Sequence, residues 1–182
     1  MESEEKNEKR LFVAVDLPEN IKEEIAKAGA KLPKDGIRPV AKENLHITLK
    51  FIGEVGTEKI EEIKAKLRTI KMKGFDCELK GVGVFPNENY IRVVWIAIES
   101  EELPHLAQAV ETALKGIGKK EDREFSPHLT IARVSKKIDL RDFLEKNKNR
   151  KFGKFTVGEF ALFESTLTPN GPIYKKIENY EL

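Results

Sequence analysis

Two copies of one short motif are the residues best suited to chemistry in this chain. They read His46-Ile47-Thr48-Leu49 and His128-Leu129-Thr130-Ile131. Side chains alternate between the two faces of a β-strand, so the His and Thr of each copy point the same way. Each copy therefore presents an imidazole and a hydroxyl on one face, while its apolar residues enter a core.

Two imidazoles at one cleft can serve as general base and general acid, because histidine titrates near neutral pH. The hydroxyls of Thr48 and Thr130 can donate to an anion such as a phosphate. Only three His occur in the chain, and two of them begin this motif, which chance rarely produces. Either His alone is more typical of a structural residue, but the matched pair predicts that His46 and His128 are catalytic.

The elements around the motifs repeat with the same offset of 82 residues that separates His46 from His128. Apolar periodicity predicts a strand, a helix, the motif strand, a second helix and a further strand, twice over. The first set lies at 11–15, 18–32, the first motif, 57–70 and 75–79, and the second at 91–98, 101–114, the second motif, 139–144 and 155–157. A last strand is expected near 174–180.

We therefore expect pseudo-repeats at about 10–90 and 91–172, followed by a closing strand over 173–182. A repeat of this length is typical of a duplicated lobe, and two facing lobes would place the histidine strands across a shared cleft. The turn residues within 81–89 favour a hairpin, and hence antiparallel pairing.

The composition predicts a globular cytoplasmic protein. The 182 residues are 40% hydrophobic and 35% charged, with a net charge of only +2, which argues against a dedicated binder of duplex DNA or membrane surfaces. The single Cys77 forms no intrachain disulfide, and the chain has no signal peptide and no apolar run long enough to span a bilayer.

The two motifs resemble the two-histidine (2H) phosphoesterase superfamily, and within it the RNA 2′,3′-cyclic phosphodiesterase family, also called the 2′-5′ RNA ligase family. The resemblance covers nearly the whole chain and is carried by residues 10–16, 43–53, 81–86, 92–95, 125–133, 165–167 and 171–174. It implies a single bilobal α+β domain over 1–182, with two mainly antiparallel sheets facing a positively charged central groove and helices outside.

The resemblance also implies hydrolysis of a 2′,3′-cyclic phosphate at an RNA 3′ end to a 2′-phosphate. His46 would be the proton donor and His128 the proton acceptor, with Thr48 and Thr130 donating to the non-bridging oxygens. The expected partners are RNA 3′ ends or nucleoside cyclic phosphates, with no membrane, no metal and no other cofactor. We expect a monomer.

Arg133 and Tyr174 are further candidates for substrate binding. Strict alternation places Arg133 opposite His128, so it needs a twist or a bulge to reach the site, and a salt bridge is an equal alternative. Tyr174 either contacts a base or phosphate, or packs within a hairpin.

The positions of five further residues also indicate roles for them. Lys42 and Lys50 flank the first motif and could attract RNA phosphates, although most Lys are simply solvated. Phe51 could contact a base, but core packing is favoured because it shares the apolar face with Leu49. Trp95 is predicted to be a core residue, and His105 to be structural.

Three rival functions remain open from the sequence. An RNA end-joining ligase would use the same two histidines, and a non-catalytic module could bind nucleotides or RNA ends. A metalloenzyme is disfavoured because no Cys, Asp or Glu stands at ligand spacing beside either His.

Overall fold

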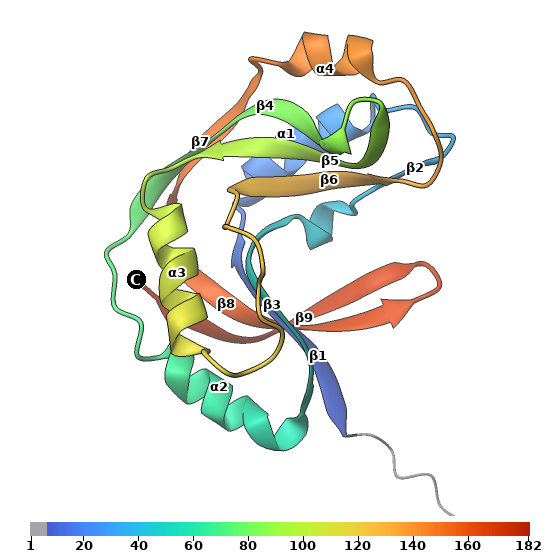
Figure 1. Cartoon of the computed structure of the whole chain (residues 1–182). Helices are drawn as coiled ribbons and strands as arrows, with labels where there is room; N and C mark the ends of the chain where they lie inside the picture. Colours follow the sequence, from blue (N-terminus) through green and yellow to red (C-terminus); the bar gives the residue numbers. More distant parts are fainter. Residues whose placement is uncertain (1–6) are drawn as a thin grey trace, which may run out of the picture.

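Two antiparallel sheets form the framework of the protein (Figure 1). The structure is a computed structural model, and it describes residues 7–182. The four-stranded sheet has the order β3-β1-β8-β9 and the five-stranded sheet the order β2-β6-β5-β4-β7. The strands are β1 Glu8–Asp16, β2 Ile37–Pro39, β3 His46–Gly56, β4 Phe75–Asn87, β5 Tyr90–Glu99, β6 His128–Val134, β7 Lys151–Val157, β8 Glu159–Thr168 and β9 Gly171–Glu181.

The helices lie on the outer sides of the two sheets (Figure 1). They are α1 Glu19–Gly29, α2 Ile60–Leu67, α3 Leu103–Ala113 and α4 Arg141–Asn147, with short 3-10 turns at Lys42–Asn44 and Thr57–Lys59. Among residues 7–182, no helix has the length and apolar character needed to cross a bilayer.

The two halves of the chain are interlocked. Helix α1 follows a strand of the four-stranded sheet but packs against β6 and β7 of the five-stranded sheet. Helix α3 follows β5 of the five-stranded sheet but packs against β3 of the other. Each sheet thus combines strands from both expected repeats with a helix that begins in the other sheet, so neither sheet is complete without the whole chain.

The predicted α+β architecture with two antiparallel sheets is confirmed, but two strands were not anticipated, the short β2 and the longer β8. Strand β8 lies inside the four-stranded sheet between β1 and β9. Its residues 160–163 are all buried, so the sequence has no alternation of apolar and polar residues there. A short continuous apolar run cannot be assigned to a strand from periodicity alone.

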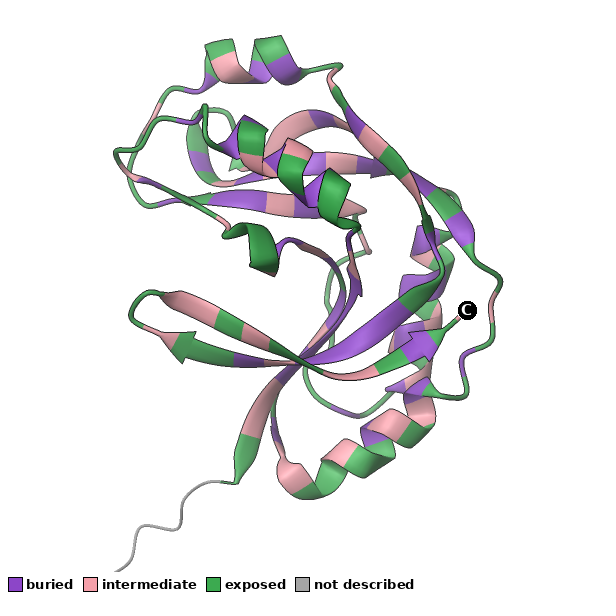
Figure 2. Cartoon of the chain, turned by 180° about the vertical axis from the view of Figure 1, so that it is seen from behind, coloured by how far each residue is buried: buried purple, intermediate pink, exposed green. Residues whose placement is uncertain are grey.

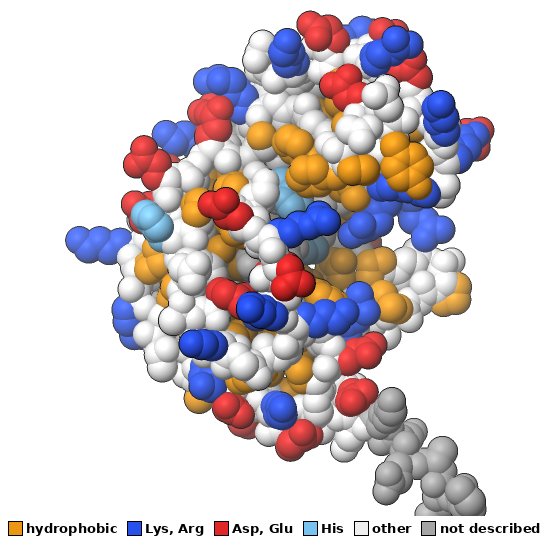
Figure 3. Space-filling model, in the orientation of Figure 1, with side chains coloured by type: hydrophobic (Ala, Val, Ile, Leu, Met, Phe, Trp, Pro, Cys, Tyr) orange, Lys and Arg blue, Asp and Glu red, His pale blue; other side chains and the backbone are white. Residues whose placement is uncertain are grey.

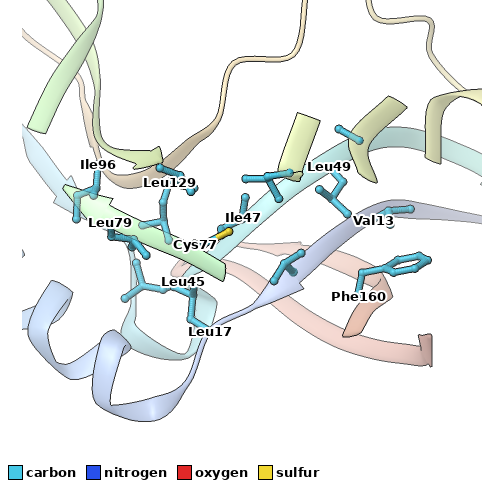
Figure 4. Packing of buried hydrophobic residues seen from close by; sticks show 14 of the residues in the cluster. Val13, Leu17, Leu45, Ile47, Leu49, Cys77, Leu79, Ile96, Leu129 and Phe160 are labelled. Carbon is cyan, nitrogen blue, oxygen red and sulfur yellow. The ribbon is translucent and has the colours of Figure 1, made fainter. Parts of the chain in front are cut away.

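One main hydrophobic cluster joins the two sheets. The apolar residues of both motifs belong to it, with Ile47 and Leu129 fully buried, which confirms their predicted orientation. Figure 2 shows buried positions along the strands of both sheets, and Figure 4 shows Ile47 and Leu129 in the same packed group with Cys77. Both motif strands are therefore anchored to a common core.

Lys50 is the exception within this buried region. An extra residue in β3, Leu49, shifts its register against β1 and turns Lys50 away from the face that carries Thr48. Lys50 is 2% exposed, and its Nζ donates to Glu111 Oε2 at 2.6 Å and to the carbonyl oxygen of Lys119 at 3.0 Å. The expectation that Lys50 attracts RNA phosphates is therefore wrong, because its charge is already paired inside the protein.

We predict that Glu111→Gln lowers the free energy of unfolding by about 1–3 kcal/mol. The substitution leaves the buried ammonium of Lys50 without its counter-charge, while the partial exposure of Glu111 limits the loss. Denaturant unfolding measures the change. Glu62→Gln is the matched control, since its pair with Lys66 is exposed, and it should cost less than about 0.5 kcal/mol. Equal effects of the two substitutions would contradict the prediction.

Candidate active site

His46 is the first residue of β3, directly after the 3-10 turn Lys42–Asn44. Its Nδ1 lies 2.6 Å from the carbonyl oxygen of Asn44. A carbonyl oxygen only accepts hydrogen bonds, so Nδ1 carries a proton and donates it. The second ring nitrogen, Nε2, lies 3.0 Å from Thr48 Oγ1, so the His and Thr of the motif share one face as predicted.

His128 has the same arrangement at the start of β6. Its Nδ1 donates to the carbonyl oxygen of Ser126 at 2.7 Å, again two residues upstream. Thr130 is partly exposed on the same strand face. In both motifs the backbone therefore orients the imidazole through Nδ1 and leaves Nε2 as the nitrogen available to a ligand.

An aromatic ring lies nearly perpendicular to each imidazole. Tyr174 of β9 stands 5.2 Å from His46 between ring centroids at an interplanar angle of 89°, and Phe85 of β4 stands 5.2 Å from His128 at 88°. Phe12 of β1 packs 4.9 Å from the His46 ring and 4.8 Å from the ring of Tyr174. These contacts restrict the tilt of both imidazoles.

A bulge in each motif strand redirects the residues that follow the threonine. One extra residue, Leu49 in β3 and Ile131 in β6, falls between two register pairs. Beyond each bulge the alternation is reversed, so the His face continues with Phe51 in β3 and with Arg133 in β6. The two bulges occupy equivalent positions of the two motifs.

Arg133 reaches the site because of this bulge, as the sequence analysis required. Its side chain is exposed, and among residues 7–182 no carboxylate lies within 4.0 Å of it. Burial raises the pKa of Tyr174, and the positive charge of Arg133 opposes that shift. Strand β3 contacts β6, and the charge of Arg133 acts on His46 as well as on Tyr174, so the two motif strands come close to each other.

The surroundings of His46 favour its neutral form. Burial among Phe12 and Tyr174 lowers the pKa of His46, an effect that its hydrogen bond to Asn44 only partly opposes. Asp16 is the register partner of His46, but its carboxylate is engaged by Lys22 at 2.7 Å. Burial raises the pKa of Asp16, but the hydrogen bond and charge of Lys22, the backbone N–H of Leu17 and the charge of Lys176 together outweigh it and lower the pKa.

Two aromatic residues lie on the groove side rather than in the core. Phe51 packs in a separate small cluster with Phe12, because the bulge at Leu49 turns it onto the His face. Trp95 alternates with core residues of β5 and is only partly buried, with its ring 5.0 Å from Phe85. Phe51 therefore packs as expected, but against this second cluster and not on the face of Leu49, whereas the expectation that Trp95 is a core residue is wrong.

The two remaining candidates, Lys42 and His105, have partners outside the two motifs. Lys42 is paired with Glu19 of α1, and His105 lies exposed on α3 beside Glu102 at 3.3 Å. Phe12 and Phe85 were not predicted from the sequence to be neighbours of the histidines. Alternation along β1 predicts which face of the strand carries Phe12. Only the sheet order shows which histidine Phe12 and Phe85 each contact.

The groove is open to solvent. Figure 3 shows histidine atoms recessed in a hollow in the middle of this face, beside Lys and Arg side chains. A separate cavity of about 430 Å³, between β4 and α4, contains neither motif. Among residues 7–182 no three His, Cys, Asp or Glu side chains converge as metal ligands would.

Comparison with known proteins gives a consistent result over the whole chain. The family described as LigT-like phosphoesterase matches residues 15–95 and again 96–174. A curated relative from Methanocaldococcus jannaschii, named RNA 2′,3′-cyclic phosphodiesterase, is 48% identical over 94% of this chain and 99% of its own length.

Solved structures show the same fold. A Thermus thermophilus protein has a TM-score of 0.84 and 33% identity over 95% of this chain and 97% of its own. The structure of Escherichia coli LigT with 3′-AMP has a TM-score of 0.83 and 30% identity, over 96% and 98%. LigT has also been solved with NADP⁺ and with ATP.

We predict that the imidazole of His46 titrates below pH 6.5, the ordinary value for histidine, in the folded protein. The unfolded chain then binds a proton that the folded chain does not, so stability falls as the pH drops from 6.5 through the lowered pKa. NMR titration of the ring and denaturant unfolding between pH 7 and 5 measure both effects. His46→Gln should remove this part of the pH dependence, and a midpoint above 6.5 would overturn the prediction.

Proposed function

The chain belongs to the LigT-like phosphoesterase family, and on that premise we propose that it hydrolyses 2′,3′-cyclic phosphate ends of RNA to 2′-phosphates. The observation that carries the proposal is the pair of matched motifs, each with a backbone-oriented imidazole beside a threonine hydroxyl. Acid–base opening of a phosphodiester needs two such groups on opposite sides of one phosphate.

In the proposed reaction, water attacks phosphorus in line with the departing 3′ oxygen. His128 accepts the proton of the water at Nε2, which is its free nitrogen because Nδ1 donates to Ser126. A bond forms between the water oxygen and phosphorus, and the bond from phosphorus to the 3′ oxygen breaks. His46 delivers its Nε2 proton to that oxygen, so the product carries a 2′-phosphate and a 3′-hydroxyl.

The low pKa of His46 links its role to substrate binding. Burial favours the neutral imidazole in the free groove, whereas a proton donor must start protonated. A cyclic phosphate carries a negative charge, and an opposite charge within a few ångströms raises the pKa of a histidine. We therefore propose that His46 gains its proton as the substrate binds.

The other groove residues bind the phosphate in this proposal. Thr48 and Thr130 donate to the non-bridging oxygens, where negative charge grows in the transition state. The guanidinium of Arg133 adds a positive charge on the same wall as His128. Tyr174 lies beside His46 on the other wall of the groove, where it contacts the ribose or the phosphate.

We further propose that the enzyme needs no metal ion or other cofactor and acts as a monomer in the cytoplasm. Side chains of the protein already carry out each step of the reaction. The two imidazoles transfer the protons, and the two Thr together with Arg133 stabilise the negative charge. The lone Cys77 and the charge-rich composition support a reducing, aqueous compartment.

His46→Ala and His128→Ala should each lower the cleavage rate by roughly two to four orders of magnitude, the usual effect of a positioned acid or base. Thr48→Ala and Thr130→Ala should lose less, on the order of ten- to a thousand-fold, because each removes one donor to a developing charge. The double His variant should be scarcely worse than the slower single variant, since acid and base act as a unit.

These rates are measured on one oligonucleotide that ends in a 2′,3′-cyclic phosphate, with melting temperatures alongside. His105→Ala is the matched control, because this exposed His lies outside the groove and should cleave at the wild-type rate. A folded His46 or His128 variant with near-wild-type cleavage would remove that residue from the mechanism.

Cleavage should persist in the presence of a chelator and follow a bell-shaped pH profile. The rate falls at high pH as the donor His46 loses its proton, and kcat/KM reports this group in the free enzyme while kcat reports it with substrate bound. The basic limb of kcat/KM should therefore lie at lower pH than that of kcat. Loss of activity with chelator and recovery with zinc or magnesium would instead indicate a metalloenzyme.

A further inference from the structure

The side chain of Asn44 joins two parts of the candidate active site that lie far apart in the sequence. Its Nδ2 donates to the carbonyl oxygen of Pro172 in β9 at 2.9 Å. Its backbone carbonyl oxygen accepts from His46 Nδ1 at 2.6 Å, and its backbone N–H donates to the carbonyl oxygen of Ala41 at 2.8 Å. Asn44 is therefore fixed to the first motif on one side and to the β8–β9 hairpin on the other.

The part of this hairpin that meets Asn44 extends beyond its sheet. Strand β8 pairs with β1 only through residues 161–164, so residues 165–174 pair with one another and, within residues 7–182, with no third strand. The loop end of the hairpin projects past the other strands (Figure 1). We call residues 165–174 the ribbon. A ribbon of two strands is only marginally stable by itself, so its position depends on what else holds it.

Few polar contacts hold the ribbon in place. It contains no charged residue and can form no ion pair, and among residues 7–182 its only hydrogen bond to another element is the one from Asn44. Tyr174, at the end of the ribbon, lies 4.8 Å from Phe12 and 5.2 Å from His46 between ring centroids. Tyr174 follows Pro172 by two residues, about 7 Å of strand, on the same face. The bond from Asn44 thus acts close to the contact between Tyr174 and His46.

We propose that Asn44 is a positioning residue, whose side chain holds the ribbon in place and thereby keeps the ring of Tyr174 against His46. The backbone carbonyl of Asn44 orients the imidazole, and its side chain places the aromatic ring that borders the same imidazole. The effect on catalysis rests on the proposed function, whereas the effect on structure is measured on the free protein.

Asn44→Ala and Asn44→Leu should each lower kcat/KM on a 2′,3′-cyclic phosphate by roughly three- to thirty-fold. Both substitutions remove the donor to Pro172 but keep the backbone carbonyl that orients His46, and Leu keeps about the volume of Asn. Tyr174→Ala should lower kcat/KM in the wild-type background. In the Asn44→Ala background it should cost less than about two-fold more, because the ring is no longer held in place.

The titration of His46 supplies a readout that needs no substrate. The ribbon contributes to the burial that lowers the pKa of His46, so Asn44→Ala should raise the midpoint measured by NMR toward 6.5. Charges also act on this imidazole, from Asp16 of β1, Lys22 of α1 and Arg133 of β6. The substitution leaves all three in place, since Asn44 bonds to none of them.

Asn147→Ala is the matched control, because the Nδ2 of this buried residue also donates to a backbone carbonyl oxygen, that of Phe143, at 2.8 Å inside α4. It should lower the melting temperature without changing kcat/KM or the His46 midpoint. A folded Asn44→Ala protein with the wild-type midpoint, or an undiminished effect of Tyr174→Ala in that background, would overturn the positioning role. A wild-type protein that cleaves no cyclic phosphate would overturn the proposed function, and the His46 midpoint would still decide the role of Asn44.

Discussion

The two faces of a β-strand are the constraint on which this site depends. Strands β3 and β6 each bury one face in a common core, through residues such as Ile47 and Leu129. Because alternation leaves no choice about the other face, His46 and His128 must line the groove. A slip of one residue in register would bury both imidazoles and expose the apolar residues, so the stability of the core also protects the geometry of the site.

The backbone then decides which nitrogen of each histidine meets a ligand. The carbonyl oxygens of Asn44 and Ser126 take the Nδ1 protons, so both imidazoles present Nε2 to the groove. A carbonyl orients the ring but, unlike a carboxylate, supplies no full negative charge to favour the cation. The protonation state of His46 is therefore governed by burial and by the charge of whatever occupies the groove.

The bulge after each threonine gives two similar strands different roles. At equivalent positions beyond the bulge, β6 places a guanidinium on the face of its histidine, and β3 places an aromatic ring on the face of its own. The ring of Phe51 in turn contacts Arg10, on the neighbouring strand β1, and Lys119, in the segment after α3. Positive charge therefore extends along both walls, although the net charge of the chain is only +2.

The sequence by itself determined the pair of matched motifs, the face on which each His and Thr lies and the order of most elements, because these follow from alternation and local periodicity. It could not place β8, whose residues are buried without a pattern, nor the partners of Lys50 and Phe51. Those depend on register, and a single extra residue such as Leu49 or Ile131 reverses the faces of the side chains that follow it. Only tertiary structure decided which residues of the two sheets meet across the groove, because strand order and bulges arise from contacts between segments far apart in the chain.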